Sequence, residues 1–139
     1  MGATKRQVLI AFESASYPRT WPADDELDKA PPFGRELAND VVQLLKERFV
    51  ACCFQEEQGW GIYTHTKTTS FRLYVHFLVL NEEHRWGIEL TGTRRWFRRD
   101  EDAAAEFADM KALVGRVVAQ IPGARDIRWL TKEEAAGLQ

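Results

Sequence analysis

The sequence predicts an α+β fold: a two-layer sandwich in which two helices cover one face of a mainly antiparallel sheet. Residues 60–91 contain three short runs of alternating apolar and polar side chains, separated by two polar turns, as in a meander of antiparallel strands. Residues 33–48 and 103–120 carry apolar side chains at spacings of three and four, as amphipathic helices do. The 139 residues are the usual length of one domain, so we expect a single core with elements in the order strand, helix, four strands, helix, strand.

The composition is that of an ordinary globular protein. Hydrophobic residues make up 45% of the chain and charged residues 29%, with a formal net charge of −2. This balance gives no overall attraction to nucleic acid or to anionic lipid. No apolar run approaches the roughly 20 residues of a membrane-spanning helix, and the apolar segment near the N-terminus is too short for a signal peptide. We therefore expect a cytoplasmic protein without a membrane partner.

The three central runs sort into two faces if Tyr63 lies opposite Tyr74 and His76 lies opposite Glu89. Under strict alternation one face is then apolar. It collects Trp60, Ile62, Val75, Phe77, Val79, Trp86, Ile88 and Leu90. The other, which we call the open face, collects Tyr63, His65, Arg72, Tyr74, His76, Glu89 and Thr91. We expect the helices to cover the apolar face and to leave the open face bare, or covered by a loop or a partner.

The chain before the first helix predicts a strand and a long loop. Residues 7–13 are apolar enough for an interior strand. Residues 14–32 contain four of the five prolines, and loops of this length are uncommon in compact domains. We favour an anchored crossover over a ligand lid. A lid would place Tyr17 or Trp21 over the row of side chains that contains Tyr74.

Residues 49–54 predict the strand that leads into the meander. A three-residue turn after this strand would place Cys52 and Phe54 on the apolar face, with Cys52 buried against Ile62. Cys52 and Cys53 are adjacent, and a disulfide between neighbours is strained. Both thiols are therefore expected to be free, as in a reducing cytosol.

The last third of the chain predicts one helix, one strand and a tail. Acidic residues at 100–102 suit the first turn of the second helix, as caps and as partners of its dipole. Pro122 and Gly123 end that helix. Residues 125–130 predict a short strand, and residues 131–139 a polar tail that adds a helical turn or frays.

The open face is the first candidate site. His76 opposite Glu89, with Tyr63 and Tyr74 nearby, would form an acid–base pair with aromatic walls. Gly61 beside His76 would leave room for a small ligand. The favoured alternative is a solvated face with a cross-strand His–Glu pair. No metal or cofactor is expected, because His65, His76 and Glu89 do not follow any metal-ligand spacing.

The segment 94–99 (RRWFRR) is the second candidate. Arg94, Arg95 and Trp96 begin a run of four arginines and two aromatic residues that suits an acidic protein surface. Nucleic acid is a weaker alternative, given the net acidic charge. The favoured interpretation is structural: a strand extension whose Trp96 or Phe97 packs under the second helix while the arginines meet residues 100–102.

The segment 56–61 (EEQGWG) is the third candidate. Its two carboxylates beside a Gly-Trp-Gly turn could position a water molecule or a basic group of a partner. The favoured interpretation is structural, because glycines at tight turns commonly supply a positive φ.

The overall layout resembles small uncharacterised bacterial α+β proteins in which a helix with F-x-x-E-L-A precedes an acidic Gly-Trp turn. The matching positions are Phe33, Glu36, Leu37, Ala38, Glu56, Glu57, Gly59 and Trp60. The resemblance implies no particular activity. Some proteins of this size and architecture are immunity proteins, which neutralise a toxin by binding it.

These observations lead to three functional hypotheses. The first is a non-enzymatic binding protein, in its most concrete form a toxin-neutralising immunity protein, that contacts a toxin or a second copy of itself through the open face and Arg94, Arg95 and Trp96. The second is a small enzyme or ligand-binding domain that uses the cluster of histidine, glutamate and tyrosine on the open face. The third is a nucleic-acid-binding module that acts through the arginines of segment 94–99.

Overall fold

The structure is a computed structural model that describes residues 5–17, 33–78 and 84–137. These residues form an antiparallel sheet of six strands and three helices, so the predicted mixed α+β class is confirmed. The elements in chain order are β1 (Lys5–Glu13), α1 (Arg35–Leu45), β2 (Cys52–Gln55), β3 (Trp60–His65), β4 (Thr69–Phe77), β5 (Arg85–Arg94), α2 (Asp100–Gln120), β6 (Arg125–Leu130) and α3 (Lys132–Ala136). Within the described residues no helix is long and apolar enough to cross a membrane.

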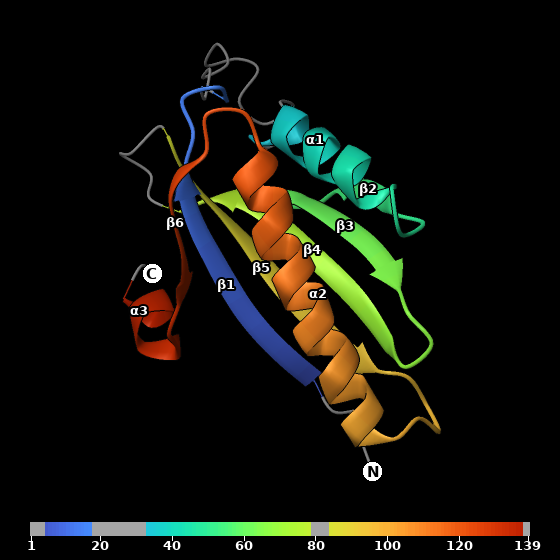
Figure 1. The fold of residues 1–139 in the computed structure, drawn as a ribbon. Coiled ribbons are helices and arrows are strands. Elements are labelled where there is room, and N and C mark those ends of the chain that lie inside the picture. The colour runs from blue at the N-terminus through green and yellow to red at the C-terminus, as the bar shows by residue number, and fades with distance from the viewer. Residues whose placement is uncertain (1–4, 18–32, 79–83, 138–139) are drawn as a thin grey trace.

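The strand order in the sheet is β2-β3-β4-β5-β1-β6. Strands β2 to β5 form the meander that alternation predicted, and β1 lies between β5 and β6, so its interior position is confirmed. Figure 1 shows α1 and α2 on the same side of the sheet, with α3 beside β6 at its edge. α1 contacts β2 and β3, whereas α2 contacts β1, β4, β5 and β6.

The core fills the space between the sheet and the two long helices. The sheet contributes large, fully buried side chains, among them Phe12, Phe71 and Trp86. The helices contribute their apolar stripes, which include Leu37 and Leu45 of α1 and Met110, Val114 and Val118 of α2. The predicted apolar face is therefore the core face for its described members, while Val79 lies outside the described residues.

The described end of the proline-rich segment also packs on the helix side. Tyr17 is buried in the core, and its hydroxyl donates a hydrogen bond to Asp40 of α1. Burial first, and then the Asp40 carboxylate, raise the pKa of Tyr17 well above its ordinary value. Tyr17 therefore does not lie over Tyr74, as a lid would require, and Trp21 lies outside the described residues.

The register of both central hairpins differs from the prediction by two residues. Tyr63 lies opposite Arg72 instead of Tyr74. Glu89 lies opposite Tyr74, and His76 lies opposite a glycine of β5. Because side chains alternate with a period of two, a shift of two residues changes the partners but leaves every residue on its predicted face.

The face of β2 was predicted wrongly. The turn between β2 and β3 has four residues, closed by a hydrogen bond of 2.9 Å from the Glu56 amide to the Gly59 carbonyl. One residue more than predicted inverts the strand, so Cys52 and Phe54 lie on the open face and are exposed, while Cys53 packs toward the core. The prediction that both cysteines are free is confirmed.

The acidic residues 100–102 form the first turn of α2 and do not cap it. The cap residue is Arg99, whose side chain makes no capping hydrogen bond. Asp100 instead pairs with Arg6 of β1 at 3.0 Å, and Glu101 pairs with Arg99 at 2.8 Å. The tail does form a helical turn, since Thr131 and Glu134 cap α3 reciprocally.

Candidate functional site on the open sheet face

The open face is the side of the sheet away from α1 and α2. Tyr63, Arg72, Tyr74, His76 and Glu89 all lie on it, as alternation predicted. Their exposure is intermediate apart from that of Tyr63, which is exposed. These five positions come from three neighbouring strands, β3, β4 and β5, so the structure brings them together.

A ladder of stacked side chains runs along β4. The guanidinium carbon of Arg72 lies 4.5 Å from the centre of the Tyr74 ring. The Tyr74 and His76 rings are 5.0 Å apart at 27° to one another. Because successive members are two residues apart, Arg72 and His76 flank Tyr74 from opposite sides along the strand. The Nδ1 atom of His76 lies 3.0 Å from the Phe77 carbonyl oxygen, which fixes the imidazole at the end of the ladder.

The Glu56 carboxylate anchors this ladder from the β2–β3 turn. It accepts hydrogen bonds from Arg72, including one from Nε at 3.2 Å, and another from the Tyr63 hydroxyl. The Arg72 guanidinium holds the pKa of Glu56 below its ordinary value, and the hydrogen bond to Glu56 raises the pKa of Tyr63. Both bonds favour the charged form of Glu56, so Arg72 is neutralised within the protein.

Sequence reasoning did not connect Glu56 with Arg72. The sequence signal for this contact was the pair of glycines, Gly59 and Gly61, that follows Glu56. A Cβ atom on Gly61 would overlap the Glu56 carboxylate, and one on Gly59 would overlap the Val75 carbonyl and the Tyr74 ring. Neither glycine has a positive φ, so the predicted reason for them was wrong. They are required for the close approach of side chains and backbone, and Glu56 fills the space predicted for a ligand over Gly61.

A pocket of about 850 Å³ opens on this face, over the middle of the sheet. Its lining comes from β1, β4, β5, the end of β6 and α3, so the short C-terminal helix forms one of its walls. Its lining includes Gln7 and Leu9 of β1, Tyr74 and His76 of β4, Glu89 of β5 and Ala135 of α3.

The predicted His76–Glu89 pair is not a direct cross-strand pair. The two side chains are diagonal neighbours, because Tyr74 and not His76 lies opposite Glu89. Burial lowers the pKa of His76 below its ordinary value, although the nearby Glu89 charge acts in the opposite direction. The imidazole is therefore neutral at pH 7, and its Nδ1 contact is with the backbone. In the described part of the chain no group of histidine, cysteine and acidic residues could hold a metal ion.

His65, Arg94, Arg95 and Trp96 do not line the pocket. His65 is exposed at the end of β3. Arg94 is the last residue of β5, where it pairs with Thr69, and Arg95 and Trp96 follow it in the β5–α2 connection. Five residues of extended strand, roughly 17 Å, separate that point from Tyr74. The predicted residues therefore form two separate surfaces.

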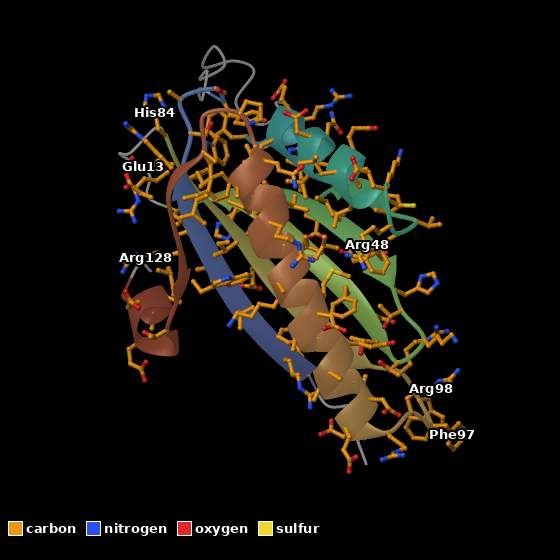
Figure 2. All side chains as sticks on the ribbon, in the orientation of Figure 1. Glu13, Arg48, His84, Phe97, Arg98 and Arg128 are labelled. Carbon is orange, nitrogen blue, oxygen red and sulfur yellow. The ribbon has the colours of Figure 1, made fainter. Side chains whose placement is uncertain are left out.

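Residues 94–99, which we call the Arg/Trp tip, form a tight and exposed turn. Trp96 is 67% exposed and Phe97 is 93% exposed, with their rings 5.3 Å apart in an edge-to-face contact. Figure 2 shows Phe97 and Arg98 projecting from the end of the molecule where α2 begins. The predicted packing of these aromatic residues under α2 was therefore wrong.

The backbone of the tip is held in place although its side chains are exposed. The Arg95 amide donates to the Thr68 carbonyl at 2.7 Å, and the Arg98 amide donates to the Arg95 carbonyl at 3.2 Å. Arg95 also donates from its side chain to the Thr66 carbonyl at 3.2 Å. Phe97 has a φ of 66°, in the left-handed region that an L residue seldom adopts.

Comparison of the chain with models of protein families, with curated proteins and with solved structures finds no match. The two surfaces are therefore interpreted from their own geometry and charge.

Proposed function

We propose that this chain is a non-enzymatic binding protein that acts by protein–protein contact, and that the Arg/Trp tip is its principal contact surface. The observation that carries the proposal is the near-complete exposure of Phe97 beside an exposed Trp96. Tryptophan and arginine are the residue types that most often dominate the binding energy of protein interfaces. In a two-layer arrangement of sheet and helices, this turn lies at one end, where a partner can reach it without displacing either layer.

The conformation of the tip is unfavourable in the free chain. Each exposed aromatic ring leaves apolar surface in water, at about 25 cal/mol per Å². A left-handed φ at a residue other than glycine costs about 1–3 kcal/mol. The hydrogen bonds from Arg95 and Arg98 hold the turn in this shape, so little further ordering is required on binding. Because the two aromatic side chains are already ordered, a partner pocket can bind them with a small loss of conformational entropy.

The charge of the tip favours an acidic partner surface. Arg94, Arg95 and Arg98 have no carboxylate within ion-pair distance among the described residues, whereas Arg99 is paired with Glu101. The partner should therefore present an apolar pocket surrounded by carboxylates. A toxin that this chain neutralises, as an immunity protein does, is the most concrete form of such a partner.

The test begins with affinity capture from the native host, using the wild type, a Trp96→Ala/Phe97→Ala double variant and Val50→Ala. Val50 is 78% exposed outside the tip and is the matched control for the loss of an exposed apolar side chain. The captured protein is then produced and titrated by calorimetry. We expect the double variant to lose about 2 kcal/mol of binding free energy, roughly a 30-fold weaker Kd, and Val50→Ala to lose nothing measurable.

Other outcomes would replace the proposal. Equal retention of one partner by all three proteins would exclude the tip as its binding site. Self-association of the purified wild type, lost in the double variant, would identify the partner as a second copy of the chain. A single-stranded oligonucleotide that binds the wild type and loses affinity in the double variant would assign the tip to nucleic acid and contradict a protein partner.

A further inference from the structure

We propose that the pocket on the open face is a second, separate site that binds a small organic cation: a primary ammonium or guanidinium group attached to an apolar portion, with Glu89 as its counter-ion. This inference goes beyond the protein–protein contact proposed for the Arg/Trp tip and does not depend on it. Three features of the pocket carry it.

The first feature is the charge balance of the pocket. The Arg72 charge is already neutralised by Glu56, which accepts its hydrogen bonds. His76 is neutral at pH 7, because burial lowers its pKa. Glu89 has no hydrogen-bond or ion-pair partner among the described residues. The charge left without a partner in the pocket is therefore the single negative charge of Glu89, which favours a cation.

The second feature is the apolar wall on the far side of Glu89. Leu9 of β1 pairs with Glu89 on one side and with Leu130 of β6 on the other, so the three side chains form one row across the sheet. Ala135 of α3 continues this wall above the sheet. A half-buried carboxylate beside an apolar wall suits a ligand with a charged head and an apolar body.

The third feature selects a cation that can donate hydrogen bonds. Quaternary ammonium groups are commonly bound against the faces of aromatic rings. Here Arg72 and His76 occupy the two sides of the Tyr74 ring, at 4.5 Å and 5.0 Å. With neither face of Tyr74 free, the carboxylate of Glu89 must supply the recognition. A charge-assisted hydrogen bond from an N–H donor is the stronger form of that contact.

The test is an NMR titration of the full chain with four probes of similar size. These are 2-phenylethylammonium, its trimethylated quaternary analogue, neutral 2-phenylethanol and anionic 3-phenylpropionate. We expect 2-phenylethylammonium to shift the amide signals of Leu9, Tyr74 and Glu89 with a Kd in the range of about 1–10 mM, as befits a small probe. The other three probes should bind about tenfold more weakly or not at all.

Glu89→Gln keeps the shape of the side chain and removes its charge, so it should weaken 2-phenylethylammonium binding about tenfold. Glu36→Gln on α1, on the opposite side of the sheet, is the matched control and should change nothing. The Trp96→Ala/Phe97→Ala variant should bind the probe as the wild type does, which separates this site from the tip.

Several results would overturn the proposal. These are an unchanged affinity in Glu89→Gln, a preference for the anionic probe, amide shifts confined to other surfaces, and the absence of shifts at the pocket with every probe. Equal binding of the quaternary analogue would overturn the requirement for an N–H donor.

Discussion

Glu56 links three neighbouring elements of the open face. It lies in the β2–β3 turn and bonds to Tyr63 of β3 and Arg72 of β4. The sequence marked this turn as unusual, because two carboxylates precede two glycines, but it did not show where the carboxylates point. That direction depends on Arg72, sixteen positions away in the chain, and so on a tertiary contact.

We predict that Glu56→Gln destabilises the fold by about 1 kcal/mol at pH 7, because a charge-assisted pair with little exposure becomes a neutral one. The pKa of Glu56 is lowered in the folded chain. Its contribution is therefore complete above the ordinary glutamate value of about 4.3 and is lost as the pH falls through the folded pKa. Urea melts at several pH values should show the difference between wild type and variant shrinking at acid pH.

Glu57→Gln is the control for this measurement, since the neighbouring Glu57 is exposed. The same pH-dependent loss in Glu57→Gln would mean that the general charge of the turn, and not the contact of Glu56 with Arg72, is responsible.

At the scale of elements, the lengths of the turns decided which predictions held. Alternation assigned the faces of β3, β4 and β5 correctly, because an error of two residues in register preserves them. The β3–β4 turn is held from outside the hairpin: the Glu106 carboxylate of α2 accepts hydrogen bonds from Thr66 and Thr68, including the Thr68 amide at 3.1 Å. A partner 38 positions away cannot be found from local sequence.

The prediction for the faces of β2 was wrong, and the length of a turn is again the physical reason. Its turn is one residue longer than assumed, and an error of one residue inverts every side chain of a strand. Phe54 and Cys52 are hydrophobic enough for a core position, so composition could not correct the error. The Glu56 carboxylate lies close to Gly61 and bonds to Arg72 of β4, a tertiary contact that the local sequence of the turn does not reveal.

Glycine substitutions test whether close approach explains the β2–β3 turn. A Cβ atom at Gly59 would overlap the backbone carbonyl of Val75, which cannot move without disturbing β4. We predict that Gly59→Ala destabilises the fold by about 1–3 kcal/mol in urea melts.

Gly115 of α2 provides the matched control. Its nearest neighbour would be the Trp129 Nε1 atom at 3.7 Å, an ordinary contact distance. Because alanine restricts the unfolded chain and favours a helix, Gly115→Ala should stabilise the protein by about 0.5–1 kcal/mol. Equal effects of the two substitutions would show that steric overlap at Gly59 is not the cause.

At the scale of the whole molecule, substitutions on the two faces of the sheet should differ in their effect on the free energy of unfolding. Phe71 is 2% exposed on the core face and stacks with Phe107 of α2, whereas Phe54 is 59% exposed on the open face. We predict that Phe71→Ala costs about 3–5 kcal/mol, as for a fully buried aromatic side chain. Phe54→Ala should cost less than about 1 kcal/mol, since it loses an edge-to-face contact with Tyr63. Similar losses in urea melts would mean that the open face is covered.

The position of β1 in the sheet has a consequence for how the chain folds during synthesis. Leu9 pairs with Glu89 and with Leu130, so the first strand to be made has no neighbour in the sheet until most of the chain exists. Strands β2 to β5 need only short turns and can pair early, but β1 must close a long loop, which is slow. The nascent protein therefore presents the unpaired edge of β5 until β1 pairs with it, and other strands can bind to the growing sheet during that interval.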